Sequence, residues 1–146
     1  MAATERATEL AQAAAAAADE KKATSITAID VSDQLALTDV FVIASGSSET
    51  QVNAIVDGVE ERLLELGAKP IRREGRRDGR WVLLDFVDVV VHVQHAEERA
   101  YYALERLWKD CPVVEIEGVE TSRRSDAAAG GADDSLASEE PQRDQE

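Results

Sequence analysis

The most apolar stretch of the chain lies at residues 81–93, where two runs of strand-forming residues follow each other almost without a break. The first run is WVLLDF at 81–86 and the second is DVVVHV at 88–93. Valine and aromatic residues favour strands, and so short a separation favours a tight turn. The pattern therefore predicts a β-hairpin at the centre of a sheet, which the flanking segments must cover.

Two further strands and a helix are predicted before this hairpin. Residues 25–31 alternate enough to indicate a first strand, and the apolar run VFVIAS at 40–45 indicates a second, buried one. Ser48 and Gln51 then have the spacing of a capping box, and apolar residues follow at helical intervals. These residues are Val52, Ile55, Val56, Val59, Leu63 and Leu66. The predicted helix begins at Ser48 and is stopped by Gly67.

Helices are also predicted at both ends of the domain. The alanine-rich segment 4–22 has acids near its start and lysines at its end, which suits the helix macrodipole. Because its apolar face is mostly alanine, we expect it to bury little area and to dock loosely on the sheet. A last helix is predicted from residue 94 to about 110, with an inward face made by Ala100, Tyr101, Leu104, Leu107 and Trp108. Residues 113–116 then form either a short strand or an extended strap.

The segment between the second helix and the hairpin combines a predicted third strand, residues 69–74, with a cluster of arginines. The cluster is Arg72, Arg73, Arg76, Arg77 and Arg80. Either it contacts phosphate, or it is a solvated hairpin with a local patch of charge. The acidic balance of the chain favours the second interpretation.

A length of 146 residues favours one domain with tails. We expect residues 1–23 to form a helix that packs on the domain and residues 24–116 to form an α/β domain. Residues 117–146 are acidic and lack an apolar period, so we expect a disordered tail.

The formal net charge of −14 limits the partners of this chain. It opposes direct binding to nucleic-acid phosphates and favours a basic protein partner. The single cysteine, Cys111, forms no internal disulfide, which favours a reducing compartment. No run reaches the roughly 18 apolar residues of a membrane helix, so we expect a soluble cytoplasmic protein without a membrane partner.

One feature suggests catalysis. The Gly46-Ser47 turn between a strand and a helix resembles the phosphate site of a nucleotidyltransferase, which also needs paired carboxylates for metal. The available acids, Asp85 and Asp88, are three residues apart and so point to opposite faces unless the turn intervenes. A nucleotidyltransferase-like enzyme using these residues is therefore the alternative hypothesis, and a plain helix cap is favoured. We expect no catalytic residue, no cofactor and no metal.

Three blocks of sequence, taken together, resemble the ribosomal silencing factors (RsfS), also called the Iojap family. They are TDVFVIASGSSETQV at 38–52, GRWVLLDFVDVVVHVQH at 79–95 and RAYYALERLW at 99–108, and the resemblance covers roughly residues 24–116. It implies an α/β domain on a mixed five-stranded sheet flanked by helices, similar to a nucleotidyltransferase fold without the active site. One departure is Val87, where the family commonly has glycine. Glycine there would relieve the strain of a positive φ, so we expect a reshaped turn.

The resemblance also implies a function. Members of the family bind a large-subunit ribosomal protein on the intersubunit face, block joining of the small subunit and lower translation when nutrients run short. We therefore expect a repressor of translation that is not an enzyme, with a basic ribosomal protein as its partner and no direct sequence-specific contact to nucleic acid.

Eight positions match the family and are expected to be partner contacts or their immediate supports. They are Trp81, Leu83, Asp85, Asp88, His92, Tyr102, Glu105 and Trp108. Either tryptophan can equally belong to the core. Tyr102 and Glu105 are three apart on the predicted last helix, so they are expected to share an exposed face. Exposed aromatic residues on a small sheet domain also suggest a homodimer as a further hypothesis.

Overall fold

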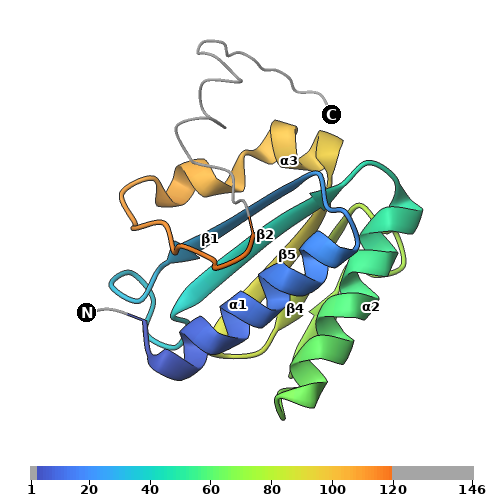
Figure 1. The fold of residues 1–146 in the computed structure, drawn as a ribbon. Coiled ribbons are helices and arrows are strands. Elements are labelled where there is room, and N and C mark those ends of the chain that lie inside the picture. Colours follow the sequence, from blue (N-terminus) through green and yellow to red (C-terminus); the bar gives the residue numbers. More distant parts are fainter. Residues whose placement is uncertain (1–2, 120–146) are drawn as a thin grey trace.

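The computed structural model describes residues 3–119, whose strands form one mixed sheet with helices on both faces (Figure 1). The elements are α1 (Glu5–Glu20), β1 (Ser25–Asp30), β2 (Val40–Gly46), α2 (Glu49–Glu65), β3 (Arg72–Glu74), β4 (Trp81–Asp85), β5 (Val89–His95), α3 (Ala96–Tyr102) and the 3-10 helix η1 (Leu104–Trp108). Residues 120–146, most of the predicted acidic tail, lie outside the described part of the chain. None of the helices within residues 3–119 has both the length and the apolar character needed to cross a bilayer.

The predicted hairpin lies at the centre of the sheet, as expected. The strand order is β1-β2-β5-β4-β3, and β5 runs parallel to β2 and antiparallel to β4. The two edge strands, β1 and β3, pair antiparallel with their neighbours. All of β2 and all of β5 except its last residue are buried, which explains their continuous apolar runs. The predicted fold, an α/β domain with a mixed five-stranded sheet, is confirmed.

Helices α1 and α2 lie side by side across one face of the sheet (Figure 1). The inward residues of α1 are at most 2% exposed: Ala7, Leu10, Ala11, Ala14, Ala15, Ala17 and Ala18. The expectation that this helix docks loosely is wrong. Its small side chains let its backbone approach the sheet closely, so the interface is packed along the whole helix.

The start of α2 is fixed by the predicted pair Ser48 and Gln51. In a capping box the Gln51 side chain would accept from the Ser48 N–H, whereas here it accepts from the Ser47 N–H. The Ser48 hydroxyl accepts a hydrogen bond from the Gln51 backbone N–H at 3.1 Å. The Gln51 side-chain oxygen accepts from the Ser47 backbone N–H at 2.7 Å, and its amide nitrogen donates to the carbonyls of Lys21 and Lys22. Gln51 therefore ties the end of α1 to the beginning of α2.

The end of α2 follows the prediction. Gly67 has a φ of +82°, and the hydrogen bonds from the N–H groups of Gly67 to Leu64 and of Ala68 to Leu63 form a Schellman motif.

The prediction of a single last helix is wrong. Helix α3 ends at Tyr102 because Ala103 takes a φ of +45°, and the chain continues as η1. The predicted inward residues Tyr101 and Leu107 are 67% and 75% exposed, whereas Arg99 is buried. Trp108 does turn back onto the sheet, where its ring lies 5.2 Å from that of Phe41.

After η1 the chain forms an extended strap along the free edge of β1. The Val114 N–H donates to the Ala28 carbonyl, and the Asp30 N–H donates to the Pro112 carbonyl, both at 2.8 Å. A single bridge pairs Ile29 with Val113. Of the two predicted forms of residues 113–116, the structure thus has the strap.

Candidate protein-binding face

The sheet face opposite α1 and α2 is only partly covered. Helices α3 and η1 lie over this face (Figure 1), yet alternate residues of β4 remain partly exposed on it. Trp81, Leu83 and Asp85 point this way, whereas Val82 and Leu84 are fully buried against the helical layer. We call this surface the candidate face; it is formed by Phe41, Trp81, Leu83, Asp85, His92, Tyr102 and Trp108.

Strand register brings the members of the candidate face together. Leu83 lies directly opposite His92 across the β4–β5 pair, and Asp85 lies opposite Val90. Phe41 of β2 pairs with Val90 on the other side of β5. Three neighbouring strands therefore contribute one continuous surface, which includes four of the residues that the sequence predicted as contacts: Trp81, Leu83, Asp85 and His92.

Aromatic rings form the centre of the candidate face. Phe41 stands between His92 and Trp108 with centroid distances of 5.1 and 5.2 Å, both edge-on. The ring of Trp81 lies 4.9 Å from that of Tyr102, which is 52% exposed at the end of α3. Such edge-on and tilted contacts are the arrangements that aromatic rings prefer, so each ring is held by its neighbours.

His92 supports this aromatic group as a neutral side chain. The indole N–H of Trp81 donates to His92 Nδ1 at 3.1 Å, which places the imidazole proton on Nε2. Burial lowers the pKa of His92 from 6.5 to about 4, because the low-polarity surroundings disfavour the charged form. Its Nε2–H has no hydrogen-bond partner among the described residues.

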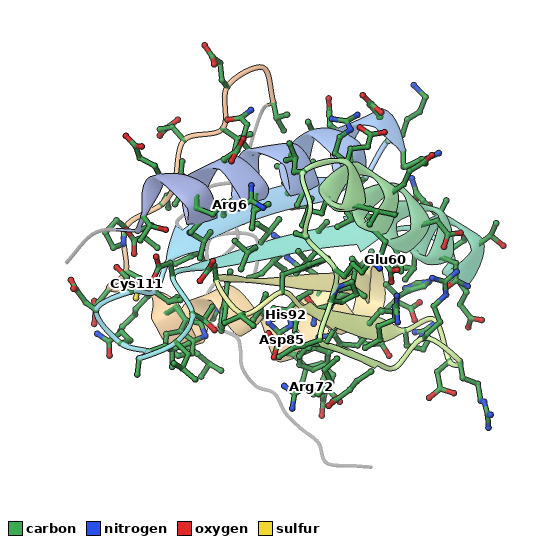
Figure 2. The ribbon with its side chains drawn as sticks, turned by 90° about the horizontal axis from the view of Figure 1, so that it is seen from below. Arg6, Glu60, Arg72, Asp85, His92 and Cys111 are labelled. Atoms are coloured by element: carbon green, nitrogen blue, oxygen red, sulfur yellow. The ribbon has the colours of Figure 1, made fainter. Side chains whose placement is uncertain are left out.

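Asp85 brings a carboxylate to the candidate face (Figure 2). One of its oxygens accepts the Val87 backbone N–H at 2.8 Å, so it also shapes the hairpin turn. The other lies 3.4 Å from a guanidinium nitrogen of Arg72. Asp85 thus joins a structural role in the turn to a charged position beside Leu83.

Val87 occupies a strained turn position: it keeps the positive φ that glycine would take, so the expectation of a reshaped turn is not confirmed. Its φ is +75°, and the N–H of Asp88 donates to the carbonyl of Phe86 at 3.0 Å, which is the pattern of a γ-turn with positive φ. This conformation is an outlier for a β-branched residue. A glycine would adopt it without steric cost.

The two remaining predicted positions differ from the others. Asp88 lies in the turn itself, and its carbonyl accepts from the N–H groups of Asp39 and Val40, so it fastens the hairpin to the start of β2. The side chain of Glu105 lies outside the described residues. The argument that Tyr102 and Glu105 share a helical face is wrong, because Ala103 interrupts the helix between them.

Arg99 is a structural support of the candidate face that the sequence analysis missed. Its guanidinium is buried beneath α3, where it donates to the Thr27 hydroxyl at 2.9 Å and lies 3.3–3.4 Å from the Ser25 carbonyl, the Ile43 carbonyl and the Ser45 hydroxyl. It thereby holds α3, and with it Tyr102, over β1 and β2. The signal in the sequence was three polar residues in two largely apolar strands, Ser25 and Thr27 of β1 and Ser45 of β2.

The alternative hypothesis, a nucleotidyltransferase-like site formed by the Gly46-Ser47 turn with Asp85 and Asp88, fails on geometry. Gly46 pairs with His95 at one end of β5, whereas Val40 pairs with Val89 at the other end, next to the hairpin turn. Six residues of strand, roughly 20 Å, therefore separate the Gly46-Ser47 turn from Asp85 and Asp88. The Ser47 hydroxyl donates instead to the Gln51 side chain at 3.1 Å, as part of the helix cap.

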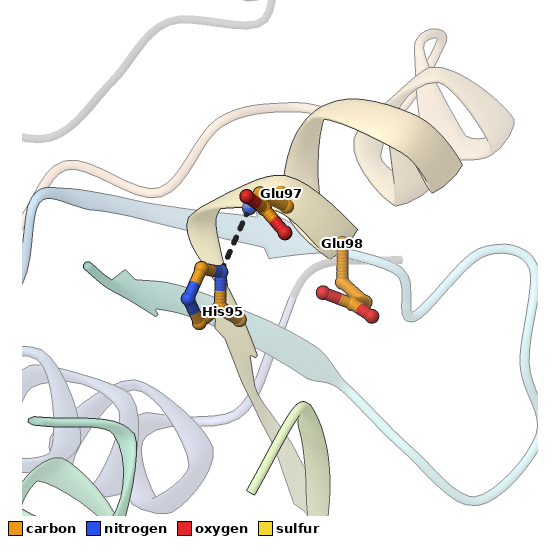
Figure 3. A group of neighbouring side chains, drawn as sticks. All are labelled: His95, Glu97 and Glu98. Carbon is orange, nitrogen blue, oxygen red and sulfur yellow. Dashed lines mark hydrogen bonds between the residues drawn. The ribbon is translucent and has the colours of Figure 1, made fainter. Parts of the chain in front are cut away.

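A group of possible metal ligands lies at the start of α3, formed by His95, Glu97 and Glu98 with ligand atoms within 4.8 Å of one another (Figure 3). His95 Nδ1 already accepts the Glu97 backbone N–H at 3.1 Å. Arg80 lies 2.7 Å from Glu97 and 2.8 Å from Glu98, and it lowers the pKa of the Glu97 carboxyl through its hydrogen bond and its charge. The group is thus an ion-pair network whose cation is Arg80.

Two other arginines of the predicted cluster, Arg73 and Arg76, are also matched with carboxylates. Arg73 forms a bidentate pair with Glu60 at 2.7 and 2.9 Å, and Arg76 pairs with Asp57 at 2.7 Å. These pairs link the segment before β4 to the outer side of α2. These ion pairs favour the predicted local patch of charge over a phosphate contact.

Comparison with known proteins assigns the family. A family model described as "Ribosomal silencing factor during starvation" matches residues 4–140. The chain belongs to this family. A ribosomal silencing factor RsfS from Halalkalibacterium halodurans is 48% identical over 111 residues, which cover 76% of this chain and 95% of that protein. The one from Bacillus subtilis is 43% identical over 71% of this chain and 88% of its own length. The crystal structure of a protein from Chromobacterium violaceum matches with a TM-score of 0.67 and 31% identity, covering 82% of this chain and 97% of that one.

Proposed function

We propose that this chain is a ribosomal silencing factor that binds the large ribosomal subunit through a basic ribosomal protein on the intersubunit face. Bound there, it blocks joining of the small subunit and represses translation during starvation. The inhibition is steric and needs no turnover. The site of action is the cytoplasm, where the ribosomes are.

The observation that carries this proposal is the candidate face. Aromatic rings, an aliphatic side chain and a partly exposed carboxylate lie together on one side of the sheet, held by strand register. Protein interfaces concentrate their binding free energy in such aromatic anchors, with polar groups at the rim. Trp81 and Tyr102 are the proposed anchors and Asp85 is the proposed polar contact.

Charge supports a protein partner over ribosomal RNA. The chain carries 30 acidic against 16 basic residues, and four of the arginines near β4 are already matched with carboxylates. A negative field attracts a basic protein and is repelled by RNA phosphates. The favoured contact is therefore protein to protein.

Sucrose-gradient sedimentation tests the proposal. The purified chain is expected to travel with large subunits and not with small ones, and to lower the peak of joined ribosomes. Tyr102→Ala should weaken the binding by about tenfold or more, since Tyr102 is an exposed anchor. Leu64→Ala is the matched control, because Leu64 is 53% exposed on α2, on the other side of the sheet. Failure of the native chain to bind large subunits would refute the proposal.

A homodimer is proposed as the form of the free protein. Tyr101, Tyr102 and Leu107 are all more than half exposed around the break between α3 and η1. A second copy would cover these apolar groups when no ribosome is bound. Light scattering that shows a monomer at high concentration would contradict this form.

A further inference from the structure

The rim of the candidate face carries one arginine between two carboxylates. In the β3–β4 pair, Arg72 lies opposite Asp85 and Glu74 lies opposite Leu83. Residues opposite each other across a strand pair point to the same side of the sheet, so Arg72 and Glu74 join Asp85 on the candidate face. Arg73 points to the other side, where it pairs with Glu60 of α2. Figure 2 shows Arg72, Asp85 and His92 on one side and Glu60 on the other.

The contacts of Arg72 are loose. Its Nε lies 3.3 Å from Glu74 and one Nη lies 3.4 Å from Asp85. Charge-assisted hydrogen bonds are normally about 2.7–2.9 Å long, and the bidentate pair of Arg73 with Glu60 has such distances, 2.7 and 2.9 Å. Arg72 is also 58% exposed. The guanidinium is therefore easily displaced from both carboxylates.

Leu83 and His92 lie beside the triad of Arg72, Glu74 and Asp85 on the candidate face. Leu83 lies between Glu74 and His92 in the register, and it is only partly buried. The Nε2–H of the buried His92 side chain has no partner among the described residues. One cation between two carboxylates leaves a local charge of −1. An apolar strip next to a net negative rim fits a basic side chain that has an aliphatic stem.

We infer that Asp85 and Glu74 receive a lysine or arginine side chain of the basic protein partner, and that Arg72 occupies this position in the free chain. Arg72 is then a specificity-determining residue. A partner that brings its own cation replaces the loose contacts of Arg72, whereas a partner that brings an acidic or neutral group must leave them in place. This inference rests on the proposed function, since it names the chemistry of the partner at the same face.

Replacing each of two neighbouring arginines by uncharged glutamine separates this role of Arg72 from a general effect of net charge. Arg72→Gln removes the internal competitor, and Arg73→Gln makes the same change of charge on the opposite side of the sheet. The Kd for purified large ribosomal subunits should fall by roughly two- to five-fold in Arg72→Gln, the gain from no longer displacing one exposed ion pair. Arg73→Gln should leave the Kd unchanged.

Asp85→Asn completes the test, because the asparagine oxygen can still accept the Val87 N–H. Binding should weaken in Asp85→Asn, and adding Arg72→Gln to it should bring a smaller gain than in the native background. A Kd that stays the same or rises in Arg72→Gln would overturn the inference while native binding leaves the proposed function standing. If the native chain does not bind large subunits at all, the proposed function fails and the inference fails with it.

Discussion

At the scale of single residues, the backbone conformation of Val87 is a clear source of strain in the structure. A residue held in a sparsely populated backbone region costs on the order of 1–3 kcal/mol, and the φ of Val87 is +75°. Glycine removes this cost, but it also increases the conformational entropy of the unfolded chain, which lowers the free energy of unfolding by roughly 0.5–1 kcal/mol. Val87→Gly should therefore raise the free energy of unfolding by about 1 kcal/mol, measured by urea denaturation. Val87→Ala keeps a Cβ and should gain less; a less stable glycine variant would show that the turn is unstrained.

His92 gives a prediction about pH. The imidazole has a pKa near 6.5 when unfolded and about 4 in the folded chain, so between these values only the unfolded chain binds the proton. Stability should therefore fall as the pH drops from 6.5 to 4, by about 3 kcal/mol at most from this residue.

The variant His92→Asn isolates that contribution. Its side-chain oxygen can still accept from the Trp81 indole, but it does not titrate, so its stability should change less across this range of pH. His95→Asn is the control, because His95 is less buried and caps α3 through Nδ1. Chemical denaturation at several pH values measures the difference; equal slopes in all three proteins would contradict the burial of a neutral His92.

At the scale of elements, Arg99 decides where α3 sits. Replacing it with methionine keeps the length of the side chain but removes the hydrogen bonds that the guanidinium donates to the Thr27 hydroxyl and the groups around it. A hydrogen bond to a charged group is worth about 1.5–3 kcal/mol, so Arg99→Met should lower the free energy of unfolding by a few kcal/mol. Arg77→Met changes an exposed arginine in the turn before β4 and should have little effect. Tryptophan fluorescence should report the loosening, since Trp81 contacts Tyr102 of α3.

The same helix marks the limit of prediction from sequence. Apolar periodicity located α2, where one buried face dominates, and the apolar runs located the central hairpin. In the structure, alternation along β4 puts Trp81, Leu83 and Asp85 on one side. Periodicity failed after Tyr102, where Ala103 takes a positive φ and the chain turns so that Trp108 packs against Phe41. The triad of Arg72, Glu74 and Asp85 depends on strand register, which the residue pattern does not give.

At the scale of the whole molecule, the net charge of −14 predicts how association depends on salt. A basic partner attracts the chain over a distance, and added salt screens this attraction, so the association rate constant for large subunits should fall as ionic strength rises. The dissociation rate constant should change much less, because the aromatic centre of the candidate face is apolar. The measurement is binding kinetics on immobilised large subunits between about 0.05 and 0.3 M salt, a range over which the Debye length drops markedly.

The sign of this dependence distinguishes the two kinds of ribosomal surface. If the chain approached RNA phosphates, like charges would repel, and added salt would speed association. A rate that rises with salt would therefore contradict a basic protein partner even if the chain binds the large subunit. A falling rate, together with tighter binding by Arg72→Gln and no change in Arg73→Gln, would place the cation of the partner at Asp85 and Glu74. The overall field then guides the encounter, and the two carboxylates, Glu74 of β3 and Asp85 of β4, select the partner.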